Sequence, residues 1–199
     1  MKPLPLSFYQ REDVLEISQE LLGKVLMTSI DGKITGGIIT ETEAYRGPED
    51  KASHAYGGRR TKRNAVMYAQ GGVSYVYRIY GIHAMFNVVT NVAEVPHAIL
   101  IRAIHPWIGI KYMLKRRHKD QIDKLFSQGP GTLAQALGID TQHNGLSLEG
   151  PEIWIEDQDI VVEKTLITSG PRVGIDYAEE HALRPWRFIY TIDPNRRKC

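Results

Sequence analysis

The sequence predicts an α+β fold in which helices flank a curved, mostly antiparallel β-sheet. Strand-like runs recur along most of the chain, and the turn Asp31-Gly32 is typical of a tight β-hairpin. No internal repeat and no low-complexity linker divides the 199 residues. We therefore expect one domain that spans residues 1–199.

The helices are predicted from apolar spacing and from residues that typically begin or end a helix. Apolar residues at helical spacing predict a helix over residues 14–22 that stops at Gly23. Helical character returns at residues 108–126 and again at residues 130–137, where Pro130 stands at the start and Gly138 follows the end. The expected strands are residues 24–30, 34–45, 73–80, 85–91, 97–104, 153–157, 162–167 and 186–192.

Composition excludes several classes of protein. The net charge is only +2, so any surface that binds nucleic acid must be a local basic patch. One basic cluster spans residues 59–63. A second spans residues 111–119, and we interpret it as a solvated helix face. The one cysteine, Cys199, excludes a disulfide framework and a thiolate zinc site. No run has the length of a signal peptide core or a membrane span, so we expect a cytosolic protein.

Aromatic and basic residues are concentrated in one segment. Six of the ten tyrosines lie between Tyr45 and Tyr80, together with a burst of Arg and Lys. Aromatic faces grip unpaired bases and basic residues hold phosphates, so the segment could form a base-stacking pocket beside a phosphate track. Composition alone favours a simpler interpretation, in which the rings pack in a β-rich core.

Strand alternation places the candidate carboxylate beside an aromatic ring. In the run ETEAY, Glu41, Glu43 and Tyr45 share one face of a strand, so Glu43 and Tyr45 can face one cavity. From the residues alone, a structural ion pair between Glu43 and Arg102 is the better interpretation, and Glu41 is a second possible base.

The run YVYRIYG separates its three rings by the same alternation. Tyr75 and Tyr77 share a face, which makes Tyr77 a candidate pocket wall. Tyr80 has the opposite parity and precedes Gly81, so it is placed at a hairpin tip. An exposed ring there could wedge between stacked bases, or it could fold back onto its own hairpin.

An ordered series of motifs resembles one known family. The segments ETEAYRGPEDKASHAYGGRRTKRNAVMY, GGVSYVYRIYGIHAMFNVVT, AILIRAI, GPGTLAQALGI, GPRVGIDYAEE and LRPWRF follow each other in the order of the alkyladenine (3-methyladenine, N-methylpurine type) DNA glycosylases. The resemblance covers residues 8–188. It implies a monofunctional enzyme of base excision repair that flips alkylated or deaminated purines out of duplex DNA and hydrolyses the N-glycosidic bond.

The resemblance implies a role for each residue of the site. Glu43 activates water, Arg102 helps to hold it, and the main-chain carbonyl of Val173 completes its site. Tyr45, His54 and Tyr77 stack on the flipped base, and the main chain of Ala52 and His54 forms hydrogen bonds with its edge. Asn87 excludes guanine, and Tyr80 fills the gap that the flipped nucleotide leaves in the duplex. Arg59, Thr61 and Arg63 contact DNA phosphates.

Plain chemistry agrees with these roles. A carboxylate can stabilise an oxocarbenium-like transition state and orient water without a metal or cofactor, and we expect neither here. Tyrosine faces favour a cationic base by roughly 0.5–2 kcal/mol per contact. The expected partner is duplex DNA containing alkylated purines, bound by a monomer that is cytoplasmic and nucleoid-associated, with no membrane.

Alternatives remain at the level of residues and of function. His54 could be a hydrogen-bonded loop residue, and Asn87 could serve only to satisfy backbone groups. Thr132 occupies a position where the family usually has Lys, so a charged contact with a DNA phosphate is in question at this position. Other candidate functions are a non-catalytic binder of flipped or damaged bases, and a hydrolase of free nucleosides that would need neither Tyr80 nor the basic loop.

Overall fold

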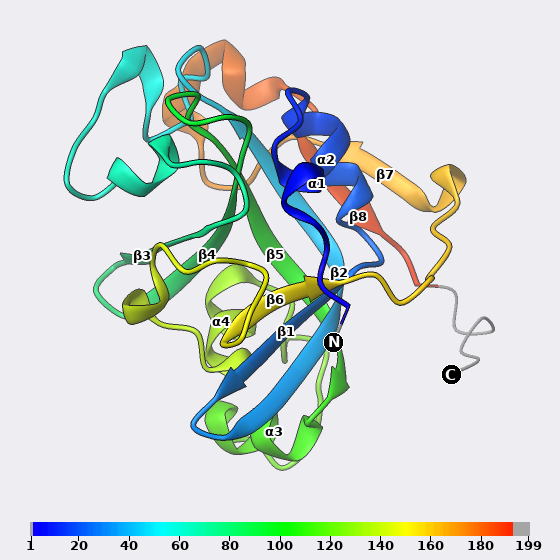
Figure 1. Ribbon diagram of the computed structural model, residues 1–199. Helices are drawn as coiled ribbons and strands as arrows, with labels where there is room; N and C mark the ends of the chain where they lie inside the picture. Colours follow the sequence, from blue (N-terminus) through cyan, green and yellow to red (C-terminus); the bar gives the residue numbers. More distant parts are fainter. Residues whose placement is uncertain (1, 193–199) are drawn as a thin grey trace.

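The computed structural model describes residues 2–192, and its central feature is one twisted β-sheet (Figure 1). Within this range the sheet has eight strands, in the order β3-β4-β5-β2-β1-β6, with β8 paired to β2 and β7 paired to β8. Every strand pairing is antiparallel, which confirms the predicted α+β class. Cys199 lies outside the described residues. No helix within them has the length and apolar character needed to cross a bilayer.

The helices and strands follow each other along the whole described chain. The helices are α1 (Leu6–Tyr9), α2 (Val14–Glu20), α3 (Ile110–Arg117) and α4 (Pro130–Leu137). The strands are β1 (Val25–Ile30), β2 (Lys33–Arg46), β3 (Ser74–Ile79), β4 (His83–Thr90), β5 (His97–Ile108), β6 (Ile153–Glu156), β7 (Ile167–Gly170) and β8 (Arg187–Tyr190). Short 3₁₀ turns, the longest of them Asp176–Leu183, connect several of these elements.

The long strands β2 and β5 form the spine of the sheet. They pair along most of their length, and their register shifts at three places, between Gly36 and Gly37, between Ile39 and Glu41, and between Glu41 and Thr42. Such bulges bend a strand and increase its twist. β2 can therefore pair with β1 in its first half and with β8 near Glu41–Glu43 in its second.

One face of this spine carries the main hydrophobic core. α2 and α4 pack against it, so that Ile17, Phe86, Ile101 and Leu133 are all buried in one cluster. Alternation along β5 turns the side chains of the neighbouring residues toward the opposite face. The core thus holds rigid the strands that present the candidate site.

Most predicted elements are confirmed, because local signals decide them. The hairpin at Asp31-Gly32 has positive φ at both residues, as its turn type requires, and α4 begins at Pro130 and ends before Gly138, whose φ is 78°. The side chain of Asp13 caps α2 by accepting hydrogen bonds from the amides of Leu15 and Glu16.

Two predictions are wrong. The helix predicted over residues 108–126 stops at Arg117, because His118 adopts a left-handed conformation; beyond it Ile122 and Leu125 stay exposed, and Phe126 packs into the core from a loop. The strand predicted over residues 162–167 begins only at Ile167, after a 3₁₀ turn. In the basic cluster at residues 111–119, Lys111 and Lys115 are exposed, as expected of a solvated helix face, whereas Arg116 donates hydrogen bonds to Thr35 and to the carbonyls of Ile30 and Ala136.

Truncation in the core tests this arrangement. Ile101→Ala should lower the free energy of unfolding by about 2–5 kcal/mol, because the side chain is fully buried and its loss leaves a cavity. Val161→Ala, at a residue that is 74% exposed, is the control and should change it by less than about 0.5 kcal/mol. Urea denaturation of both variants measures the difference, and equal losses would contradict the packing described.

Candidate active site

A pocket of about 240 Å³ opens where β2, β3, β4 and β5 meet the segment that begins at Val173. Its wall gathers residues that are far apart in the sequence. Those predicted from the sequence are Tyr45, Ala52, His54, Arg63, Tyr77, Tyr80, Asn87, Arg102 and Val173; Tyr75, Met85, Leu100 and Tyr177 are among the others. The structure thus brings most of the predicted site residues to one cavity.

Glu43 is fully buried and does not itself line this pocket, but it contacts three residues that do. The hydroxyl of Tyr45 donates a hydrogen bond to Glu43 Oε2 at 2.8 Å, and the main-chain N–H of Val173 donates one to Oε1 at 2.8 Å. The guanidinium of Arg102 lies 3.4 Å from Oε1. Burial raises the pKa of Glu43, and Arg102 and these two hydrogen bonds oppose the rise.

Arg102 is bound more closely to Glu41 than to Glu43. Its Nε donates a hydrogen bond to Glu41 Oε1 at 2.9 Å, and Arg187 approaches the same oxygen at 3.5 Å. Glu41 is therefore the counter-ion of two arginines, which does not suit it to act as a base. Arg102 remains close enough to Glu43 to favour its charged form.

The aromatic wall is built from side chains that contact one another. The rings of His54 and Tyr77 are 4.7 Å apart, and those of Tyr75 and Tyr77 are 5.2 Å apart. His54 Nδ1 and the hydroxyl of Tyr75 form a hydrogen bond of 2.8 Å. His54 is thus both a hydrogen-bonded loop residue and part of the pocket. Burial, followed by repulsion from Arg63 and Arg59, lowers the pKa of His54 to about 4.

Two polar groups at the pocket already have protein partners. The side-chain amide of Asn87 donates to the carbonyls of Tyr75 and Met85, at 3.0 and 3.2 Å. Asn87 therefore satisfies backbone groups and also lines the pocket. The carbonyl of Ala52 accepts a hydrogen bond of 3.3 Å from the hydroxyl of Tyr177, a residue that sequence reasoning missed.

The predicted phosphate contacts lie around a neighbouring hollow of about 410 Å³. Arg59, Thr61 and Arg63 line it, and His54 and Tyr177 are shared with the first pocket. Arg63 places its guanidinium 4.9 Å from the centre of the Tyr77 ring. Cations therefore border the aromatic pocket on one side, whereas the hydroxyl of Thr61 is hydrogen-bonded to Asn64 within the same loop.

Tyr80 lies at the edge of the pocket and is mostly exposed to solvent. Its side chain is 87% exposed at the tip of the β3–β4 hairpin, so the alternative in which the ring folds back onto the hairpin is wrong. Tyr80 also has φ near 52°, an uncommon conformation for a bulky residue. Ile82 beside it is 73% exposed, so the tip presents two apolar side chains that contact no core.

Thr132 is positioned near the start of α4, but its hydroxyl is engaged. It donates a hydrogen bond of 2.8 Å to the carbonyl of Gly129. The hydroxyl proton is therefore unavailable to a phosphate at the same time. Among residues 2–192 there is also no group of three or more His, Cys, Asp or Glu side chains that could hold a metal ion.

The chain is similar to known proteins along nearly its whole length. The family model described as methylpurine-DNA glycosylase matches residues 7–194. The chain belongs to this family. Similar relatives carry the provisional name 3-methyladenine DNA glycosylase: one from Chlamydia felis is 50% identical over 98% of this chain and 99% of its own length. A Chlamydia abortus relative is also 50% identical, over 95% and 98%, and one from Bacillus cereus is 45% identical, over 96% of each chain.

The electrostatics of the glycosylase pocket can be tested without a substrate. His54 should stay neutral above about pH 5, and Arg63→Ala should raise its pKa because a nearby positive charge is removed. Arg78→Ala is a matched control, since Arg78 is paired with Asp140 instead. NMR titration of the histidine resonances measures both; a His54 that titrates near pH 6.5 in the unmodified protein would contradict the geometry.

Proposed function

We propose that Glu43 is the general base of a DNA glycosylase that excises a flipped, alkylated purine of the 3-methyladenine type. Membership of the methylpurine-DNA glycosylase family makes the chain a hydrolase of base excision repair, and its relatives name 3-methyladenine. The observation that carries the assignment of Glu43 is its environment. It is a fully buried carboxylate next to the aromatic pocket, with a raised pKa and both oxygens held by residues that line that pocket.

The reaction requires only a base and a positioned water. Glu43 takes a proton from water as the oxygen forms a bond to C1′ of the sugar, and the bond from C1′ to the purine nitrogen breaks. The electron pair of that bond leaves with the base, so a cationic alkylated purine departs neutral and needs no acid. The carboxylate also stabilises the positive charge that develops on the sugar. Arg102 and the carbonyl of Val173 hold the water.

The pocket walls account for base binding. A purine must leave the stack before water reaches C1′, which costs a few kcal/mol and requires a site that stacks the base. Tyr45 and the pair His54 and Tyr77 supply those faces, the main chain of Ala52 and His54 reads the edge, and Asn87 excludes the exocyclic amine of guanine. The neutral state of His54 supports this role, because it adds no charge against a cationic base.

The surroundings of the pocket account for DNA binding. Tyr80 fills the gap left by the flipped nucleotide, which its exposure at the hairpin tip supports. Arg59, Thr61 and Arg63 contact phosphates along the neighbouring hollow. We also propose that the chain acts as one domain and as a monomer, in the cytoplasm with the nucleoid.

A binder of flipped or damaged bases without catalysis is the alternative function. The same aromatic walls would serve it. A binder, however, gains nothing from a fully buried carboxylate beside an arginine, since such burial disfavours the charged form. The site is therefore better explained by hydrolysis.

Removal of the base should abolish excision and retain binding. Glu43→Gln should slow release of 3-methyladenine from methylated duplex DNA by at least about 100-fold, because only the proton acceptor is lost. Glu16→Gln, at an exposed carboxylate on α2 that does not line the pocket, is the control and should leave the release rate nearly unchanged. Single-turnover release and DNA binding are measured for both. If the unmodified protein binds the lesion but releases no base, the chain acts as a binder.

The acid limb of the pH–rate profile should report on Glu43. Activity should fall as pH decreases through a pKa above the ordinary glutamate value of 4.5, because burial favours the protonated form, which cannot accept a proton. Tyr45→Phe removes a donor that favours the carboxylate, so its limb should move to still higher pH. Tyr68→Phe, whose hydroxyl donates to the carbonyl of Arg59, is the control. An unshifted limb in Tyr45→Phe would contradict the assignment.

A further inference from the structure

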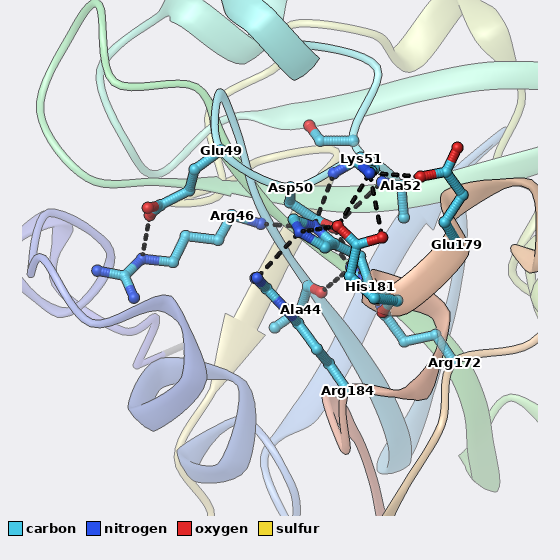
Figure 2. A network of polar contacts seen from close by, with 12 residues as sticks. Ala44, Arg46, Glu49, Asp50, Lys51, Ala52, Arg172, Glu179, His181 and Arg184 are labelled. Atoms are coloured by element: carbon cyan, nitrogen blue, oxygen red, sulfur yellow. Dashed lines mark hydrogen bonds and ion pairs between the residues drawn. The ribbon is translucent and has the colours of Figure 1, made fainter.

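Behind the pocket lies a buried ion pair that sequence reasoning did not single out. The guanidinium of Arg172 and the carboxylate of Asp50 are both fully buried, with N–O distances of 2.5 and 2.8 Å for the two hydrogen bonds that join them (Figure 2). Burial opposes ionisation of Asp50, but the hydrogen bonds and charge of Arg172 outweigh it and lower the pKa of Asp50. The pair is thus ionised and neutral as a whole.

This pair joins three parts of the site. Arg172 donates to the carbonyl of Ala44, the residue between Glu43 and Tyr45, at 2.8 Å, and Asp50 accepts from the amide of Ala52 at 3.1 Å. Arg172 is also the residue before Val173, whose N–H contacts Glu43. Figure 2 shows Arg172, Asp50, Ala44 and Ala52 with the hydrogen bonds that join them. The pair therefore connects the base, a stacking ring and the main chain that reads the purine edge.

The position of the charge relative to Tyr45 has a second consequence. The guanidinium of Arg172 lies 4.8 Å from the centre of the Tyr45 ring, within the range of a cation–π contact. Tyr45 lines the pocket, whereas Arg172 is fully buried and does not. The cation thus lies behind the ring and the stacked base in front of it. An unpaired cation there would repel a positively charged base and draw electron density from the ring that stacks it.

From this arrangement we propose that Asp50 and Arg172 form a charge-neutral support behind Tyr45 that lets the pocket accept a cationic base. Both are positioning residues, because neither touches the base. The proposal rests on the proposed function, since it assumes that Tyr45 stacks a flipped purine. Asp50 cancels the charge of Arg172, and Arg172 holds Ala44 and Val173 in place. Substitutions at the two residues can therefore distinguish an effect on the shape of the pocket from an effect on its preference for a charged base.

The test compares a cationic with a neutral lesion in the same duplex. Duplexes with one 7-methylguanine or one hypoxanthine are bound to Glu43→Gln protein, in which hydrolysis does not interfere, and Kd is measured by fluorescence anisotropy. Adding Asp50→Asn leaves Arg172 uncompensated and should weaken binding of the 7-methylguanine duplex about threefold to tenfold more than that of the hypoxanthine duplex. The double change Asp50→Asn and Arg172→Gln removes both charges and should restore the original ratio of the two Kd values.

The outcomes separate charge from structure. If Asp50→Asn and the double change each weaken binding of the two duplexes equally, the pair only maintains the structure, and the proposal is overturned. If circular dichroism shows that Asp50→Asn is not folded, Arg172→Gln is tested instead, because it removes the positive charge. The ratio of the two Kd values should then shift in favour of the 7-methylguanine duplex. No shift, or a shift toward hypoxanthine, overturns the proposal. Failure of the proposed function is distinct, because unmodified protein would then release no base.

Discussion

The site depends on keeping one carboxylate charged where water is nearly excluded. Glu43 is fully buried, and a buried carboxyl is driven toward its neutral form, in which it cannot accept a proton. The hydroxyl of Tyr45, the amide of Val173 and the charge of Arg102 counter this tendency together. The fold can be understood as the means of bringing these three groups to one point, since they come from β2, β5 and the segment after β7.

Two clusters of charged residues hold the neighbours of Glu43 in place. Glu41 engages Arg102 and Arg187, which keeps Arg102 from pairing closely with Glu43. Asp50 engages Arg172, which carries Val173 and contacts the back of Tyr45. A buried charge without its partner is strongly destabilising, so each pair fixes the position of its neighbours. The pocket is thereby organised before any DNA arrives, which limits the ordering required on binding.

Local patterns in the sequence predict a large part of this structure. The alternation of Glu41, Glu43 and Tyr45 predicts their common face, because strand periodicity acts over two residues. The position of Tyr80 at the hairpin tip follows from its opposite parity and from Gly81, whereas the exposure of its ring was left open by the sequence. Local patterns fail for the strand expected at residues 162–167. Residues that favour strands form one only where a neighbouring strand offers hydrogen bonds, and β8 pairs with this segment only from Ile167 onward.

Long-range contacts could not be predicted in this way. Arg172 lies 122 residues from Asp50, and no periodicity links the two. Which carboxylate Arg102 approaches more closely depends on the bulges in β2 near Glu41. Tyr177 reaches the carbonyl of Ala52 across 125 residues. The family resemblance proposed which residues react, but the groups that support them became visible only in three dimensions.

The most direct test of the account is a crystal structure of the Glu43→Gln protein with a duplex that contains one hypoxanthine. The account predicts a nucleotide rotated out of the duplex, its base stacked between Tyr45 and the rings of His54 and Tyr77. It also predicts Tyr80 in the gap, and Arg63 on a phosphate. A base that remains stacked in the duplex, or DNA bound on another face, would contradict it.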